Sequence, residues 1–215
     1  MRLYQHYCSQ NFTNTYIVGT DYDSAGQVST SREAVIIDPG AMDSAILKHI
    51  ENNGYALKAA LITHEHDAHV AGLRSLKRIY DIEVYSAGKT VLDHKENIVH
   101  DNEVLKILSG LNIQVFSVPG HSSDSVVYRI ENLLFTGDSL SAGLLGSTDS
   151  SFGAMRLIST IQKKIFALQG NLIILPGHGP LSTLDVERVY NTGIGLFQEQ
   201  MTKSKRPSIH FDFIG

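Results

Sequence analysis

The sequence predicts an α+β fold in which two mixed β-sheets pack face to face and helices cover the outside. Two patterns predict it: short apolar strands come in runs in both halves of the chain, and amphipathic helical patterns lie between those runs. A chain of 215 residues is also long enough to bury a substantial core without disulfides. We expect a single domain that spans residues 1–215.

Short apolar runs predict the strands of both sheets. They fall at residues 16–18, 34–37, 59–62, 84–85, 113–118, 125–130, 133–136 and 172–175. A polar, glycine-containing segment at 21–32 separates the first two strands, as in a hairpin with a long loop. Glu131 and Asn132 lie between two other strands and predict a tight turn, so those two strands should pair.

Four amphipathic patterns predict helices. Their apolar residues are Met42, Ile46, Leu47 and Ile50; Val70, Leu73, Leu76 and Ile79, in a helix at about residues 68–80; Leu157, Ile158, Ile161, Ile165 and Leu168; and Val186, Val189, Tyr190, Ile194 and Phe197. We expect these stripes to face the core rather than a cofactor. Gly193 and Gly195 weaken the last helix, each by roughly 1 kcal/mol relative to alanine.

The composition limits the classes of partner. Eighteen lysines and arginines against 22 aspartates and glutamates give a net charge of −4, which offers no support for nucleic acid or an anionic membrane as a partner. Cys8 is the only cysteine, so no internal disulfide can form and a reducing compartment is favoured. No signal-like or membrane-spanning apolar run is present. We therefore expect a cytoplasmic protein with a small-molecule substrate and leave its oligomeric state open.

Three histidines lie within six residues of one another. His64, His66 and His69 belong to the segment THEHDAHVAG at 63–72, directly after the apolar run at 59–62. Imidazoles crowded at the end of a buried strand need a partner, and the usual one is a transition metal.

His121, Asp138 and His178 share that setting. Each follows an apolar strand and lies in a glycine-containing turn. Strand ends on one edge of a sheet can bring distant segments to one site. Five of the ten histidines occupy such positions, together with one aspartate, and this concentration predicts a metal site.

Four motifs, in this order, resemble the metallo-β-lactamase-fold superfamily and within it the glyoxalase II-like branch. They are THEHDAHVAG at 63–72, PGH at 119–121, FTGDSL at 135–140 and LPGHGP at 175–180. IDPG at 37–40 and the segment at 176–191 also resemble that branch. The resemblance implies a four-layer αββα sandwich with the site at one edge, and a hydrolase of thioester or related acyl substrates.

The resemblance also implies roles for six side chains. His64, His66 and His121 would bind a first metal, His69 and His178 a second, and Asp138 would bridge the two. It implies zinc, with one or two ions per chain and the first site more secure; iron is also possible.

The chain departs from the family pattern at Ala68, at residues 122–124 and at residues 147–149. An aspartate ligand of the second site falls on Ala68, which offers no donor atom, so we expect a weak second site. We interpret Asp67 as the N-cap of the following helix rather than as a replacement ligand, and Glu65 as a solvated residue or a partner of a ligand. Residues 147–149 read Ser-Thr-Asp where relatives often carry Arg-Thr-Asp, so the role of that arginine is open.

Three functions are compatible with these residues. In a metal-dependent hydrolase, which we rank first, His64, His66 and His121 hold the metal and Asp138 orients the attacking hydroxide. A mononuclear iron persulfide dioxygenase would need only His64, His121 and Asp138, so Ala68 would be harmless to it. In a non-catalytic metal-binding protein, Ala68 and the missing arginine would be active-site residues that changed after the activity was lost.

Overall fold

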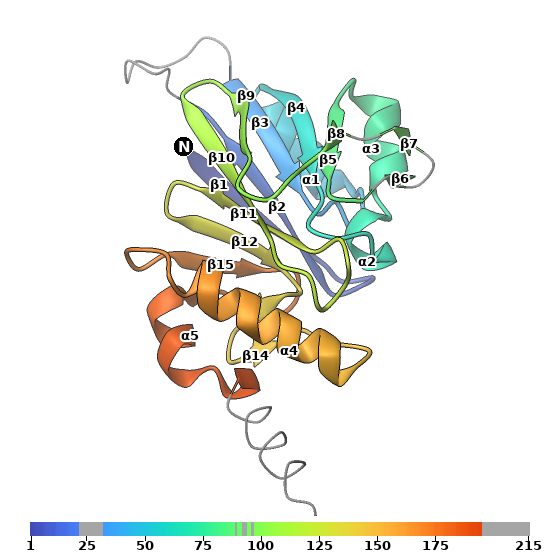
Figure 1. The fold of residues 1–215 in the computed structure, drawn as a ribbon. Coiled ribbons are helices and arrows are strands. Elements are labelled where there is room, and N and C mark those ends of the chain that lie inside the picture. Colours follow the sequence, from blue (N-terminus) through green and yellow to red (C-terminus); the bar gives the residue numbers. More distant parts are fainter. Residues whose placement is uncertain (22–31, 89, 92–93, 96, 195–215) are drawn as a thin grey trace, which may run out of the picture.

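Two six-stranded mixed sheets lie face to face, and helices cover both outer sides (Figure 1). This computed structural model describes residues 1–21, 32–88, 90–91, 94–95 and 97–194. The predicted four-layer αββα sandwich is confirmed. Among the helices of the described ranges, none is long and apolar enough to cross a membrane.

The first sheet has the order β1-β2-β3-β4-β5-β8. Its strands are β1 (Arg2–Cys8), β2 (Thr13–Gly19), β3 (Arg32–Ile37), β4 (Tyr55–Leu61), β5 (Glu83–Ser86) and β8 (Asn97–Ile98). β1, β2 and β3 pair antiparallel, whereas β3, β4, β5 and β8 run parallel. Ile37 pairs with Leu61 at the ends of β3 and β4, so the residues that follow, Asp38 and His64 among them, emerge at one edge.

The second sheet has the order β16-β15-β12-β11-β10-β9. Its strands are β9 (Val104–Leu108), β10 (Leu111–Ser117), β11 (Val126–Ile130), β12 (Leu133–Gly137), β15 (Ile173–Pro176) and β16 (Ser182–Thr183). Only β12 and β15 run parallel, and Gly137 pairs with Pro176 at their ends. Asp138 and His178 therefore also emerge side by side.

Short hairpins and helices complete the fold. The hairpins are β6 (Thr90–Val91) with β7 (His94–Lys95), and β13 (Leu140–Ser141) with β14 (Leu144–Leu145). The helices are α1 (Ser44–Asn52), α2 (Asp67–Val70), α3 (Leu73–Ile79), α4 (Ser151–Thr160), the π-helical turn η1 (Ile161–Ile165) and α5 (Leu184–Tyr190). Asp43 caps α1, because its Oδ1 accepts hydrogen bonds from the amides of Ala45 and Ile46.

Three apolar layers hold these parts together. The central layer lies between the sheets and includes Tyr16, Tyr128 and Phe135. A second layer packs α1 and α3 on the first sheet, and a third packs α4 and η1 on the second. Burial of these surfaces, at roughly 25 cal/mol per Å² of apolar area, is the main force that fixes the sheets and thus the site at their edge.

The predicted helix at 68–80 is two short helices, α2 and α3, and the single-helix prediction is wrong. The break lies at Gly72, whose amide donates to the carbonyl of Pro39 instead of to a carbonyl within the preceding turn. Leu73 and Leu76 are buried as predicted, but Ile79 is 51% exposed because it ends the second helix.

The predicted apolar face of the last helix is also wrong. In α5, Val189 and Tyr190 are each 71% exposed, whereas Leu184 and Glu187 are buried. Glu187 can face inward because its carboxylate accepts hydrogen bonds from Gly143 N, Ser182 Oγ and Asn191 Nδ2. Gly195 and Phe197, included in that prediction, lie outside the described residues.

All eight predicted strands are present, with shifted ends. β4 begins at Tyr55 rather than at residue 59. The strands β1, β8, β9 and β16 and the two hairpins were not predicted. β1 is an edge strand with mostly exposed or half-buried side chains, so it has no apolar run that could have marked it.

Candidate metal centre

The ends of both sheets meet at one edge, and the six predicted site residues all lie there. Thr63 O accepts a hydrogen bond from Val126 N of the second sheet, and Asn14 N of the first sheet donates to Gly177 O. These two backbone links tie the turn after β4 to β11 and the turn after β15 to β2. Gly177 N also donates to Gly137 O, which ties the turn after β15 to the end of β12. The side chains form two groups, which we name the first and second donor groups.

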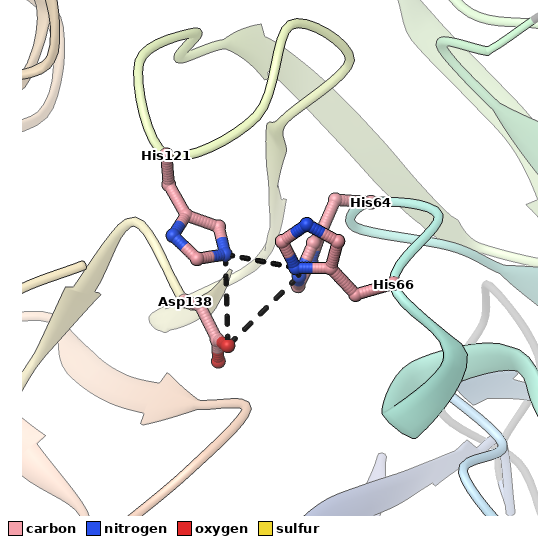
Figure 2. A group of neighbouring side chains, drawn as sticks. All are labelled: His64, His66, His121 and Asp138. Atoms are coloured by element: carbon pink, nitrogen blue, oxygen red, sulfur yellow. Dashed lines mark hydrogen bonds and ion pairs between the residues drawn. The ribbon is translucent and has the colours of Figure 1, made fainter. Parts of the chain in front are cut away.

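The first donor group consists of His64, His66, His121 and Asp138 (Figure 2). His66 Nδ1 lies 2.9 Å from His64 Nε2 and 3.1 Å from His121 Nε2. Asp138 Oδ2 lies 3.9 Å from His64 Nε2 and 3.8 Å from His121 Nε2. With bonds of about 2.0–2.1 Å, tetrahedral zinc ligands lie about 3.3–3.4 Å apart, so the four donors surround a space of the size that such an ion needs.

Hydrogen bonds fix which nitrogen of His64 and of His121 faces that space. Thr63 Oγ1 donates its hydrogen to Asp38 Oδ2, at 2.7 Å, so His64 Nδ1, 3.1 Å away, must donate to Thr63. His121 Nδ1 donates to the carbonyl of Ser147 at 2.7 Å. His64 and His121 therefore present a lone pair on Nε2 to the common space, which is the form that binds a metal.

The second donor group consists of His69, Asp138 and His178. His69 Nε2 lies 3.4 Å from Asp138 Oδ2, and His178 Nδ1 lies 2.8 Å from Asp138 Oδ1. His69 Nε2 is buried and has no hydrogen-bond partner among the described residues. A buried nitrogen without a partner is costly unless something fills the gap. The group thus fits a metal, with three donor side chains instead of four.

Asp38 is a supporting residue whose role the sequence did not reveal. Its Oδ2 accepts from His69 Nδ1 at 2.9 Å and from Thr63 Oγ1 at 2.7 Å, and its Oδ1 accepts from Thr63 N. Its backbone has a φ of 48°, a conformation that is uncommon outside glycine and that these bonds hold in place. Asp38 orients His69 directly and His64 through Thr63. The turn at Asp38-Pro39-Gly40 was the only signal of it in the sequence.

Burial and charge set the protonation states of the centre in the absence of metal. Burial, helped by the neighbouring His69, lowers the pKa of His64 to about 2. For His69 burial acts in the same direction, but the charges of Asp38 and Asp138 and the hydrogen bond to Asp38 outweigh it and raise the pKa to about 10. Burial alone would raise the pKa of Asp138, but His178 and His69 lower it well below its usual range. Asp138 therefore stays ionised and ready to bind a cation.

Neither Ala68 nor Asp67 adds a donor to the second group. The Ala68 carbonyl accepts from Asn11 Nδ2 and Thr13 Oγ1, which fixes the turn but adds no donor. Asp67 is exposed and belongs to neither group. The prediction that Asp67 is an N-cap is wrong, since His66 occupies the cap position without a side-chain hydrogen bond and Asp67 is the first helical residue. Its charge there favours the helix N-terminus.

Asp124 supports the histidine segment from the second sheet. Its Oδ2 accepts from Glu65 N at 2.9 Å, and Ser122 Oγ bonds to Ser125 Oγ at 2.6 Å. The turn after His121 is thereby closed by side chains. The Glu65 side chain is half-buried and its Oε1 has no hydrogen-bond partner among the described residues.

A cavity of about 250 Å³ opens over both donor groups, and we name it the main cavity. His121, Asp138, Ser141, Ser147 and His178 are among its lining residues. A metal held by the donor groups would therefore be reachable by a small molecule. This arrangement can support a reaction in which a bound metal would activate water or a carbonyl group of an organic molecule in the cavity.

Comparisons with known proteins agree with this geometry. The family model described as Metallo-beta-lactamase superfamily matches residues 12–186. The hydroxyacylglutathione hydrolase GloC of Haemophilus influenzae is 29% identical, with 74% of this chain and 86% of that protein covered. The crystal structure of the BLEG-1 B3 metallo-beta-lactamase is 28% identical, with a TM-score of 0.74 and coverage of 90% of this chain and 99% of that one.

The structure of ETHE1 from Myxococcus xanthus, at 24% identity, supports the fold alone; its TM-score is 0.79, over 97% of this chain and 93% of that one. The range matched by the family model contains every member of both donor groups. This match covers most of the chain, and the relatives include a hydroxyacylglutathione hydrolase. The chain therefore belongs to the metallo-β-lactamase superfamily and fits its glyoxalase II-like branch.

Proposed function

We propose that this protein is a metal-dependent hydrolase that cleaves thioesters or related acyl substrates. The observation that carries the proposal is the first donor group, in which three imidazoles and one ionised carboxylate face a common space beneath the main cavity. The hydroxyacylglutathione hydrolase among its relatives acts on a thioester by its name, which favours that substrate class here. We propose a small-molecule substrate and a cytoplasmic location, as the sequence predicted.

His64, His66 and His121 would hold the ion, and zinc is the metal that this donor set favours. When bound, zinc supplies a Lewis acid that lowers the pKa of water from 15.7 to about 7. Thr63 and Ser147 keep the two flanking rings in the metal-binding tautomer. Asp138, which stays ionised, would accept a hydrogen bond from the attacking water or hydroxide and aim its oxygen at the substrate carbonyl.

The proposal includes unequal occupancy of the two donor groups. Loss of a residue that supports a ligand typically costs about 10–100-fold in affinity. The second group has three donors and Ala68 supplies none, so its affinity should be lower than that of a complete site by at least this factor. We propose one firmly bound ion per chain and a weak second ion. Because the chemistry above uses only the first group, loss of the second ion should slow the reaction rather than abolish it.

Kinetics with a matched pair of variants test this function. The zinc-loaded protein should hydrolyse simple acyl thioesters, and His66→Ala should lower kcat/KM by at least about 100-fold. His100→Ala, at an exposed histidine outside both donor groups, should leave kcat/KM unchanged. A fully metal-loaded wild-type protein without thioesterase, esterase or lactonase activity would refute the proposal.

A mononuclear iron dioxygenase acting on persulfides is the second candidate. His64, His121 and Asp138 provide two imidazoles and one carboxylate, the ligand set of oxygen-activating iron, and this chemistry would not need the weak second group. Purification with bound iron and persulfide-dependent oxygen uptake would favour it. Full activity of iron-free protein would exclude it. Bound metal without either activity would favour a non-catalytic metal-binding role.

A further inference from the structure

A second pocket opens beside the donor groups and shares one wall with the main cavity. This side pocket has a volume of about 200 Å³, and its lining includes His121, Ser122, Asp149, Phe152 and Arg156. His121 lines both spaces. A molecule whose reacting carbonyl lies in the main cavity can therefore extend past one imidazole into the side pocket.

Arg156 is the one lysine or arginine in the lining of the side pocket. Among the described residues, nothing forms a hydrogen bond or ion pair with its guanidinium. Other described arginines are engaged: Arg129 Nε donates to Glu131 O, and Arg188 pairs with Asp185. A guanidinium offers five donors in a planar fork that matches a carboxylate in a bidentate manner. Arg156 thus presents a free carboxylate-binding group.

The position of Arg156 relative to His121 is fixed by tight packing. Gly120, which precedes His121, has a φ of 147°, and a Cβ added to it would lie 2.5 Å from Leu157 Cβ and 2.7 Å from Gly153 O. Leu157 follows Arg156 in α4, which Ser150 caps through a hydrogen bond from Gly153 N. The backbone that carries the metal-facing imidazole therefore touches the backbone that carries the arginine.

The size and walls of the side pocket indicate what fits there. At about 30 Å³ per water molecule, a volume of about 200 Å³ holds roughly seven waters, which is enough for a carboxylate on a short carbon chain. Phe152 is 69% exposed and offers an apolar surface for that chain. The lining thus combines a cationic end with an apolar side.

We propose that the side pocket selects acyl thioesters that carry a free carboxylate a few bonds from the scissile carbonyl, and that Arg156 binds this carboxylate. The proposal rests on the proposed hydrolase function and adds the substrate class. In the reaction, oxygen from water bonds to the carbonyl carbon and the carbon–sulfur bond breaks, which yields an acid and a thiol. Arg156 touches only the distant carboxylate.

Asp149, whose charge is opposite to that of Arg156, lines the same pocket and allows a second test of the proposal. Its exposed carboxylate lines the wall and makes no ion pair with Arg156 within the described part of the chain. Asp149 repels an anionic group, so Asp149→Asn should strengthen binding of a carboxylate substrate while Arg156→Met weakens it. A change of opposite sign for these two substitutions is specific to charge and would not follow from a general disturbance of α4.

Selectivity between matched substrates is the decisive measurement. The acetyl thioester of 3-mercaptopropionate is compared with that of 3-mercaptopropionamide, and a glutaryl with a valeryl thioester of N-acetylcysteamine. For at least one pair, wild type should favour the acid in kcat/KM by about tenfold, which corresponds to ~1.4 kcal/mol. Arg156→Met should remove that preference, Arg156→Lys should keep part of it, and Asp149→Asn should increase it. Lys163→Met, an equal charge change at an exposed site nearby, should leave it unchanged.

Failure of this inference can be distinguished from failure of the proposed function. Hydrolysis of the neutral thioesters without preference for either acid would overturn the carboxylate site alone, as would a preference that survives in Arg156→Met. Absence of any hydrolysis would overturn the hydrolase function. Carboxylate binding can also be measured without catalysis, from the rate at which phenylglyoxal modifies each arginine, as determined by peptide mass spectrometry. Glutarate should slow the modification of Arg156 but not that of the exposed Arg78. Equal rates for Arg156 with and without glutarate would overturn the carboxylate site.

Discussion

The two donor groups share Asp138 but differ in what the chain supplies around it. The first offers three further side chains, whereas the second offers two, of which His178 is 39% exposed. Position 68 on the four-residue helix α2 accounts for the difference, because its methyl group offers no ligand atom. Under the proposed function, a single side chain makes the two adjacent sites unequal while the hydrogen bonds that support both groups persist. Five substitutions test that contrast.

The largest expected difference arises when one histidine is removed from each donor group in turn. His121→Ala removes a ligand from the first group and should lower kcat/KM for a thioester by at least about 100-fold. His178→Ala removes a ligand from the weaker group and should cost less than about tenfold. Steady-state kinetics at saturating zinc measure both. Equal losses would mean that the reaction depends on both groups alike.

Asp38→Asn tests the support that the two groups share. The amide has a single accepting oxygen, so it cannot accept from Thr63 N as well as from His69 Nδ1 and Thr63 Oγ1, as the two carboxylate oxygens do. Metal affinity should fall by about 10–100-fold, and more in the second group, since His69 is touched directly and His64 only through Thr63. Competition with a chelator measures the two affinities. A loss confined to the first group would contradict this arrangement.

Ala68→Asp should sharpen the comparison by completing the second group. A carboxylate at this position supplies the missing donor, and affinity for a second zinc ion should rise by about tenfold or more. Calorimetric zinc titration of the variant should resolve two binding events, against one firm and one weak event in the wild type. Two equally tight events in the wild type would show that Ala68 does not limit the second site.

The smallest effect is expected at Asp67. Its side chain is exposed and belongs to neither group, so Asp67→Asn should leave zinc stoichiometry and affinity unchanged. The loss of a negative charge in the first turn of α2 should cost only about 0.3–1 kcal/mol at low salt, as thermal unfolding would measure. A marked loss of the second ion would mean that Asp67 replaces the absent ligand.

The candidate donor residues could be predicted because their signals are local. His64, His121, Asp138 and His178 each follow an apolar strand, and strands and turns are readable from short windows. The pairing of β3 with β4, and of β12 with β15, then places these strand ends together.

Other features depend on contacts that no short window contains. The bonds of Asp38 to Thr63 and His69 span 25 and 31 residues. The inward turn of α5 depends on Gly143, which binds Glu187 across 44 residues. Similarly, an arginine in an amphipathic helical pattern is usually interpreted as a solvent-exposed residue. The packing of Gly120 against α4, which no short window of sequence shows, places Arg156 beside the candidate metal centre.

Elemental analysis of the purified protein tests the central claim most directly. If the first donor group holds the working ion, wild-type protein dialysed against metal-free buffer should retain about one zinc or iron per chain, and His66→Ala should retain almost none. An equal metal content in both proteins, or a wild-type protein that binds no metal when supplied with zinc or iron, would contradict it.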